Sequence, residues 1–216
     1  MVRKTIENFS IYQICDSGQC FRMTPIHGET DPASGEIRMQ VIAGDRYLEI
    51  LQNGKECMFD CTEEEFEGFW KEYFDLETDY ANYIAQINPN DTYLLNAAAF
   101  GSGMRILRQD LWEVIISFII SQNNNIPRIK KSIKKLCAEN NGKFPEWYDL
   151  INMDLTDKGL GYRDEYIRNA CYARATTFTD DDLESGYANA KAQLMKIKGV
   201  GEKVASCILL FGLHYL

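Results

Sequence analysis

The sequence has no long hydrophobic run. Its longest uncharged apolar stretch, residues 114–120 with their neighbours, is far too short to span a bilayer. The first seven residues are followed by no apolar segment, so no signal peptide is expected. With 216 residues, of which 45% are hydrophobic and 25% charged, the chain is expected to be a soluble intracellular protein with one substantial core or two modest ones.

The sequence also lacks the residue spacings of a metal site. Its seven cysteines are scattered and include no Cys-x2-Cys pair, and an odd set of this kind suits a reducing compartment better than a disulfide framework. The two histidines, His27 and His214, stand far apart and have no other ligands at a suitable spacing. Zinc sites, iron–sulfur sites and a Ser-His-Asp triad are therefore disfavoured.

Positive charge is scarce, but it is concentrated in one segment. The formal net charge is −9, which argues against a nucleic-acid partner if the protein is treated as a uniform sphere. Residues 101–143, however, contain eight Lys and Arg against three Asp and Glu, a local charge of +5. Because electrostatic screening at physiological salt acts over about 8 Å, a phosphate responds to this nearby segment more than to distant acidic ones.

The hydrophobic pattern changes once along the chain. The first 60 residues favour an antiparallel sheet, with strands expected over 37–42, 47–51 and 56–59 and a hairpin turn at Asn53-Gly54. A capping box at Thr62 then begins a helical pattern whose aromatic residues are expected in the core, and only helices are expected beyond Asn90. We place the domain boundary near residue 88.

A helix-hairpin-helix signature lies near the end of the sequence. Within Leu194–Phe211, an apolar helical pattern stops at Gly199-Val200-Gly201 and resumes with Lys203 in the first turn of the next helix. We expect both glycines to allow positive φ in a tight hairpin. The free N–H groups of the second helix would then converge on one point, which is a common position for a phosphate.

Lys203 is the leading candidate for chemistry. An ordinary lysine is neutral in only about one molecule in 2,500 at pH 7, so an amine nucleophile needs help from its surroundings. The positive end of the helix dipole and desolvation by an enclosed base both disfavour the ammonium form. A neutral amine could attack a sugar C1′ and form a Schiff base. From the hairpin alone, a lysine that only touches phosphate or is solvated is the favoured interpretation, because phosphate contacts outnumber covalent roles.

Four further stretches, in order with the hairpin, resemble the 8-oxoguanine DNA glycosylase/AP lyases of the helix-hairpin-helix superfamily. The resemblance implies an α+β fold, with a TBP-like antiparallel sheet domain at 1–88 and an all-α helix-hairpin-helix domain at 89–216. It also implies that Lys203 is the Schiff-base nucleophile. The four stretches are Ser17–Arg22, Leu107–Asp110, Ser117–Arg128 and Leu160–Tyr166.

The resemblance assigns two residues to the damaged base. Gly18 matches the glycine whose carbonyl accepts a hydrogen bond from N7–H of 8-oxoguanine, a proton that guanine lacks. Cys207, one helical turn after Lys203, matches a cysteine that lines the base pocket. From the residues alone, Gly18 reads as a turn glycine that ends a strand, and Cys207 as a small core residue.

The resemblance assigns four more residues to the gap in the DNA stack that the flipped base vacates. Asn123, Arg128 and Arg163 match residues that bind the orphan cytosine, and Tyr162 matches the wedge beside it. Base flipping exposes such an orphan, and arginine donors suit the O2 and N3 acceptors of cytosine. Without the resemblance, the asparagines read as a helix C-cap and Arg163 as a loop cation.

The resemblance also concerns cofactors and the C-terminus. No cofactor is required, and the hairpin resembles one that holds Na⁺ or K⁺ through backbone carbonyls, here those of Met195, Ile197 and Val200. The family uses a second catalytic residue, an aspartate in a Pro-Val-Asp segment beyond the hairpin, which has no counterpart before Leu216. We therefore expect a C-terminally truncated chain whose own activity depends on the missing part.

The sequence thus predicts a base-excision repair enzyme that removes 8-oxoguanine from duplex DNA and cuts the abasic strand by β-elimination. The expected partner is double-stranded DNA containing oxidised guanine, with no membrane association. A cytoplasmic, nucleoid-associated monomer is expected. The alternatives are a glycosylase for another damaged purine, such as an alkylated one, and a non-catalytic DNA-binding module that uses the hairpin only for phosphate.

Overall fold

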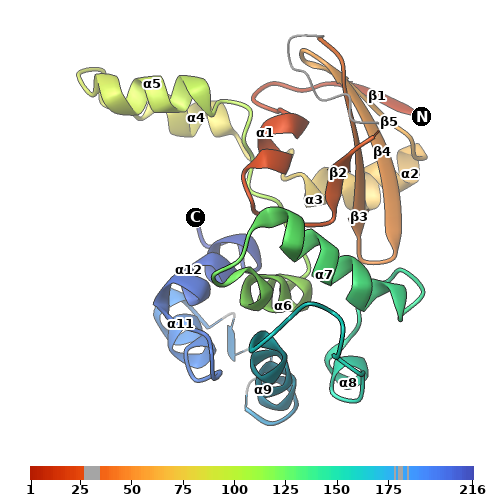
Figure 1. Cartoon of the computed structure of the whole chain (residues 1–216). Helices are drawn as coiled ribbons and strands as arrows, with labels where there is room; N and C mark the ends of the chain where they lie inside the picture. Colours follow the sequence, from red (N-terminus) through yellow and green to blue (C-terminus); the bar gives the residue numbers. More distant parts are fainter. Residues whose placement is uncertain (27–34, 178, 180–181, 184) are drawn as a thin grey trace. The chain divides into compact units, whose positions relative to one another are not determined.

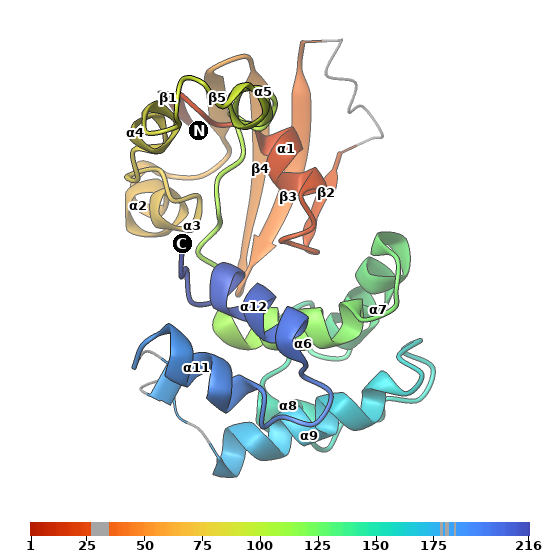
Figure 2. The ribbon, with the colours of Figure 1, turned by 90° about the vertical axis from the view of Figure 1, so that its left-hand side faces the viewer.

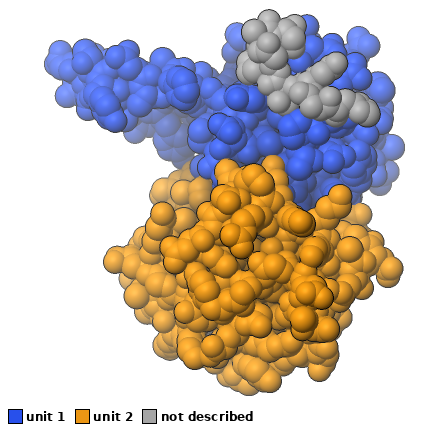
Figure 3. Space-filling view, viewed as in Figure 1, with its two compact units in different colours: residues 1–42, 46–107 blue, residues 43–45, 108–216 orange. Residues whose placement is uncertain are grey.

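The computed structural model describes residues 1–26, 35–177, 179, 182–183 and 185–216. His27, one of the two histidines, lies outside them. The chain forms two compact units (Figure 3): unit 1 comprises residues 1–42 and 46–107, and unit 2 comprises residues 43–45 and 108–216. Among the described residues, no helix is both long and apolar enough to cross a membrane.

The sheet predicted for the N-terminal region is present and antiparallel. Its strand order is β1-β5-β4-β3-β2 (Figure 1). Strands β4 and β5 are joined by the predicted Asn53-Gly54 turn, with Asn53 paired to Glu56. The strands are β1 (Val2–Thr5), β2 (Met23–Pro25), β3 (Ile37–Ala43), β4 (Arg46–Asn53) and β5 (Glu56–Phe59).

One face of the sheet forms the core of unit 1. Alternate residues of β3, β4 and β5 are buried, as the period of two in a half-buried strand requires. Phe59 on β5 contacts the rings of Phe66 and Phe74, with ring centroids 4.9 and 6.0 Å apart. These two aromatics belong to the segment predicted from the Thr62 capping box, which is observed as α2 (Glu63–Glu65), a π-helical turn η2 (Phe66–Trp70) and α3 (Lys71–Tyr73).

The short helices of unit 1 differ in how much they bury. Helix α1 (Ile11–Asp16) buries Ile11 and Ile14, and the buried side chain of Gln52 accepts a hydrogen bond from the Ile11 N–H at 2.8 Å. In contrast, α4 (Tyr80–Ala85) and α5 (Thr92–Phe100) contain no buried residue. They form a helical hairpin that projects from the rest of unit 1 (Figure 1).

The boundary between the units lies at Leu107, about twenty residues beyond the predicted position near residue 88. The segment after α5 remains attached to unit 1 by buried polar side chains. Gln19 accepts a hydrogen bond from the Leu107 N–H at 2.8 Å and donates one to the Arg105 carbonyl at 2.9 Å. Arg105 in turn donates to the carbonyls of Asn8 and Asp75, at 2.9 and 2.7 Å.

Unit 2 is built around α6, whose residues 112–120 are all buried. Helices α7, α9 and α12 pack against α6, α8 packs against α9, and α11 packs against α12 (Figure 2). These helices are α6 (Leu111–Ser121), α7 (Ile126–Ala138), α8 (Trp147–Leu150), α9 (Arg163–Thr176), α11 (Tyr187–Leu194) and α12 (Glu202–Phe211).

Candidate active site and nucleic-acid interface

The predicted hairpin joins α11 to α12, and its two glycines have different roles. Gly199 has φ of +93°, and a Cβ placed there would lie 2.4 Å from the ring of Tyr166. Gly201 instead has φ of −88° and extended geometry, so the expectation of positive φ at both glycines was wrong for Gly201. The tight turn therefore depends on Gly199, which has to accommodate both the backbone conformation and the tyrosine ring.

The N-terminus of α12 has no side-chain cap. Its N-cap residue is Gly201, whereas α6 and α7 are capped by the side chains of Asp110 and Asn125. The first N–H groups of a helix have no intrahelical acceptor, so those of α12 remain available to a ligand. An uncapped N-terminus at a glycine hairpin is suited to bind a phosphate group.

Lys203 lies in this first turn of α12. Its side chain is exposed, and no ion pair or side-chain hydrogen bond joins its amine to the described residues. The preceding Glu202 is directed elsewhere, because it pairs with Lys191 at 2.8 Å. The amine is therefore sterically accessible at the positive end of a helix.

Cys207 lies one turn further along α12 and is half-buried. Burial raises the pKa of its thiol, and the nearby charge of Lys203 lowers this pKa in part. The two side chains thus share one region of the helix surface, as the i, i+4 spacing predicts. A neutral, half-buried thiol beside an amine is compatible with the wall of a base pocket and with core packing.

Gly18 lies in unit 1, immediately after α1. Ser17 is the C-cap of this helix and Gly18 follows it with φ of +77°, which is the left-handed position where helices commonly end at glycine. Gly18 therefore follows the end of a helix, and the prediction that it ends a strand was wrong. The next residue, Gln19, is fixed by hydrogen bonds to the Ser17 side chain and to the backbone of Arg105 and Leu107.

Arg163 connects the N-terminus of α9 to the loop between α6 and α7. Its Nε and Nη2 both donate to the carbonyl of Gln122, Nε at 2.8 Å, and Nη2 also donates to the carbonyl of Asn123 at 3.0 Å. Nη1 donates to the carbonyl of Leu160 at 3.0 Å. The side chain is buried, with 6% of its surface exposed. In this structure, the guanidinium therefore binds backbone carbonyls.

Asn123, Tyr162 and Arg163 form one cluster. The amide of Asn123 donates to the hydroxyl of Tyr162 at 3.3 Å, and the guanidinium of Arg163 lies 4.6 Å from the centre of the Tyr162 ring. Asn123 has φ of +46°, a conformation that asparagine tolerates better than most residues. Tyr162 is 48% exposed, so its ring is available to a ligand. Three of the four residues assigned to the orphan base are thus in contact.

Arg128 lies in the first turn of α7, separate from these contacts. Its backbone N–H donates to the side chain of the N-cap residue Asn125 at 3.0 Å, while its own side chain is exposed. Of the asparagines predicted to form a helix C-cap, Asn125 instead caps the N-terminus of the following helix. The sequence Asn125-Ile-Pro is typical of a helix start, because proline is favoured in the first turn.

The three hairpin carbonyls assigned to a cation differ in their hydrogen bonding. Among the described residues, the carbonyl oxygens of Met195 and Val200 accept no turn or loop hydrogen bond, whereas that of Ile197 accepts one from the Val200 N–H at 2.9 Å. Carbonyl oxygens without a donor suit alkali cations. Two of the three carbonyls assigned to a cation, those of Met195 and Val200, therefore meet this condition.

Sequence reasoning missed three supporting residues. Gln19 and Arg105 fix the backbone beside Gly18, and Tyr166 fills the space that Gly199 leaves open. The signal for Tyr166 was its position one turn after Tyr162, because residues at i and i+4 share one helix face. The buried polar pair had no signal, since its partners are backbone groups distant in the sequence.

The first 115 residues match the family model described as "8-oxoguanine DNA glycosylase, N-terminal domain". The chain belongs to this family. It is 34% identical over 139 residues to an N-glycosylase/DNA lyase of Saccharomyces cerevisiae, covering 52% of this chain and 37% of the yeast protein. The chain thus spans well under two thirds of the length of that curated relative.

Solved structures support the same family over nearly the whole chain. The apo-form 8-oxoguanine glycosylase/lyase of Clostridium acetobutylicum is 32% identical with a TM-score of 0.86, covering 98% of this chain and 76% of that one. The same enzyme with double-stranded DNA containing cytosine opposite 8-oxoG is 30% identical with a TM-score of 0.85, covering 99% and 78%. The predicted fold, a sheet domain followed by a helix-hairpin-helix domain, is confirmed.

Proposed function

We propose that this protein acts in base-excision repair, removing 8-oxoguanine from duplex DNA and then cutting the abasic strand by β-elimination. The observation that carries the proposal is the exposed, unpaired amine of Lys203 at the uncapped N-terminus of α12, on the glycine hairpin of a family member. The relatives named N-glycosylase/DNA lyase support the same pair of activities.

Recognition of the damaged base is assigned to the Gly18 carbonyl. In 8-oxoguanine N7 carries a hydrogen and donates to this carbonyl, whereas in guanine N7 is an acceptor and would face the carbonyl unpaired. An unsatisfied buried polar pair costs about 1–3 kcal/mol, or roughly 5- to 150-fold in affinity. Cys207 is assigned to the wall of the base pocket in this proposal.

The chemistry proceeds through a Schiff base. The neutral amine of Lys203 attacks C1′, the C1′–N9 bond breaks, and the electron pair leaves with the base, which takes up a proton. The C1′–O4′ bond then breaks, O4′ takes up a proton and becomes a hydroxyl, and the nitrogen electron pair forms the protonated Schiff base at C1′. Removal of a C2′ proton then expels the 3′ phosphate, and water later releases the lysine. An amine nucleophile needs no cofactor for these steps.

In this proposal, the hairpin binds the DNA backbone beside the lesion. The free N–H groups at the start of α12 bind a phosphate, with Gly199, Val200 and Gly201 forming the approach. We also propose that Na⁺ or K⁺ binds the carbonyls of Met195, Ile197 and Val200 when DNA is present. Such an ion supplies positive charge next to the phosphate.

The cluster around Asn123 receives the orphan cytosine. Tyr162 wedges into the stack, and Asn123, Arg128 and Arg163 offer donors to the unpaired base. Because Arg163 already donates to three backbone carbonyls, its guanidinium has to release at least some of them to reach a base. We further propose a monomer that works in the cytoplasm, associated with the nucleoid through DNA.

Borohydride trapping tests this function. With an abasic duplex, Lys203 is expected to form a covalent adduct that Lys203→Gln abolishes and that Lys196→Gln, a control at an exposed hairpin lysine, retains. With an 8-oxoguanine duplex, the same adduct reports base removal.

The alternatives give different results in the same assay. Adducts with an alkylated purine duplex and not with 8-oxoguanine would indicate another glycosylase. Binding of every duplex without any adduct would indicate a DNA-binding module and contradict the proposed chemistry. An adduct that survives Lys203→Gln would remove Lys203 from the mechanism.

A further inference from the structure

Helix α7 has a lysine-rich exposed face. Its thirteen residues, IPRIKKSIKKLCA, contain five Lys and Arg and no Asp or Glu. The buried face consists of Ile129, Ser132, Ile133, Leu136 and Cys137. At 100° per residue, Lys131 and Lys134 point away from this face, and both are exposed. The packing of α7 on α6 therefore turns these two lysines to solvent.

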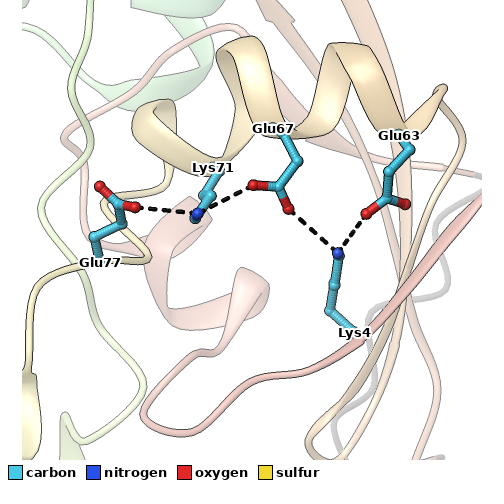
Figure 4. Close-up of polar contacts among 5 residues, drawn as sticks. All are labelled: Lys4, Glu63, Glu67, Lys71 and Glu77. Atoms are coloured by element: carbon cyan, nitrogen blue, oxygen red, sulfur yellow. Dashed lines mark hydrogen bonds and ion pairs between the residues drawn. The ribbon is translucent and has the colours of Figure 1, made fainter.

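Most lysines elsewhere in this acidic chain are paired with carboxylates. In Figure 4, Lys4 contacts Glu63 and Glu67 at 2.6 and 3.3 Å, and Lys71 contacts Glu67 and Glu77 at 3.0 Å each. Further pairs join lysines and acids on other surfaces: Lys55–Glu7, Lys143–Asp45, Lys158–Glu139, Lys191–Glu202 and Lys198–Glu165.

Lys131 and Lys134 differ from that pattern. No ion pair or side-chain hydrogen bond joins either amine to any described residue. Their neighbour Lys135 is engaged, since it donates to the carbonyl of Asp157. In a chain with 32 acidic residues and 23 basic ones, these two lysines thus form no ion pair with a carboxylate in the described part of the chain.

The two lysines continue a row that begins at Arg128. Residues 128, 131 and 134 follow one another at intervals of three, so they lie along one side of α7, and Arg128 also has an exposed side chain. The row is about 9 Å long at 1.5 Å per residue. One DNA strand rises about 3.4 Å per nucleotide, so this length covers two to three phosphates.

We propose that Lys131 and Lys134 bind backbone phosphates of the DNA strand opposite the lesion. The proposal rests on the proposed function, because it uses Arg128 as a contact to the orphan cytosine on that strand. With Arg128 at the orphan base, the row runs along the phosphates of the strand to which this base belongs. The contacts are independent of sequence and of damage, since phosphates carry no base information.

The salt dependence of DNA binding measures these contacts. Each phosphate neutralised by a lysine contributes about 0.9 to the slope of log K against log[salt]. Lys131→Gln/Lys134→Gln should therefore reduce the slope by about 1.8, so that the affinity of the unchanged protein falls about tenfold more than that of the variant between 50 and 200 mM salt. The slope should decrease equally for lesion-containing and undamaged duplexes.

A matched variant controls for net charge. Lys55→Gln/Lys143→Gln removes the same two charges from exposed lysines that already have carboxylate partners. Its salt slope should change by less than about 0.5. Equal slopes for the α7 variant and the unchanged protein would overturn the proposal, as would equal losses in the two double variants.

Neutral methylphosphonate linkages identify the strand. Placed beside the cytosine on the opposite strand, they should weaken binding of the unchanged protein and have little further effect on the α7 variant. The reverse result, with sensitivity only on the lesion strand, would overturn the strand assignment. If the α7 variant loses slope but the protein shows no preference for 8-oxoguanine and no trapped adduct, the proposed function fails while the phosphate contacts stand.

Discussion

Gly199 carries two constraints at one backbone position. Its φ of +93° disfavours any L side chain, and a Cβ there meets the Tyr166 ring. Gly199→Ala is expected to lower the free energy of unfolding by about 2–4 kcal/mol, from left-handed strain and overpacking together. Urea unfolding monitored by circular dichroism measures this.

Gly201→Ala is the matched control for that substitution. Gly201 has negative φ, and no atom lies within 4 Å of the position that a methyl group would take there. Alanine at this position should therefore change the free energy of unfolding by less than about 1 kcal/mol. Similar losses at both glycines would contradict the different roles assigned to them.

Because of Cys171, the stability of unit 2 is expected to depend on pH in the alkaline range. Burial raises the pKa of its thiol to about 12, above the usual value of about 9 in an unfolded chain. Below pH 9 the thiol is protonated in both states, so its titration leaves the free energy of unfolding at its full value. Above pH 9 the unfolded chain loses the proton while the folded state keeps it, so the free energy of unfolding falls as the pH rises toward 12.

Unfolding titrations at pH 8, 9 and 10 test this dependence. Cys171→Ala should weaken the decline in unfolding free energy above pH 9, by up to about 1.4 kcal/mol per pH unit. The variant is less stable at every pH because it removes a buried side chain, so the slope is the relevant readout. An unchanged slope would contradict the prediction.

At the scale of single residues, candidate site residues could be named from the sequence, whereas their contacts could not. Asn125 shows why: three consecutive asparagines suggest a helix end, but the proline that follows makes the last one an N-cap. The carbonyl partners of Arg163 could not be predicted, because they depend on where α9 meets the α6–α7 loop. The assigned roles of Lys203, Gly18 and the orphan-base residues stay predictions.

At the scale of elements, Arg163 links the N-terminus of α9 to the loop between α6 and α7. Arg163→Lys keeps the charge but loses the planar fork that reaches the carbonyls of Gln122, Asn123 and Leu160. We expect it to lower the free energy of unfolding by about 2 kcal/mol in the absence of DNA. Arg128→Lys, at an exposed arginine, should change it by less than about 0.5 kcal/mol.

Denaturant unfolding of the two free variants measures this difference. A loss of orphan-base preference in Arg163→Lys with unchanged stability would assign the residue to DNA alone. Equal destabilisation by both arginine substitutions would contradict the linking role.

The elements themselves were largely predictable. Strands β3, β4 and β5 lie where alternation placed them, because one buried face imposes a period of two. The strands at β1 and β2 were not predicted, since four- and three-residue strands give almost no alternation. The π-helical turn within residues 66–70 also had no signal, because it changes the hydrogen bonding but keeps the aromatic face buried.

At the scale of the whole molecule, the α4–α5 hairpin exposes apolar surface. Tyr93 and Phe100 are 83% and 84% exposed. Tyr93→Ser/Phe100→Ser should change the melting temperature by less than about 2 °C and reduce association at high concentration, because exposed aromatics promote self-contact. Sedimentation velocity over a concentration series measures the self-association.

Tyr73 provides the control for this prediction, since it is 4% exposed in the same unit. Tyr73→Ser should lower the melting temperature markedly because it leaves a cavity. A large loss of stability in the α4–α5 variant would instead mean that the hairpin contributes to the core in solution.

The domain boundary depends on features that no local pattern reports. A change from strands to helices predicted a division near residue 88, yet the chain stays with unit 1 to Leu107. The reason is the set of buried polar side chains, Gln19 and Arg105 above all, that bind irregular backbone. Such contacts join residues more than eighty positions apart.

These contacts have a consequence for proteolysis. Residues 101–107 contain no helix or strand, and by composition they resemble a connector that trypsin would cut after Arg105. A protease, however, needs the backbone around the scissile bond in a released form, and here this backbone is held by buried hydrogen bonds on both sides of Arg105. Native digestion should therefore spare this connector, and cleavage there would report that unit 1 has opened.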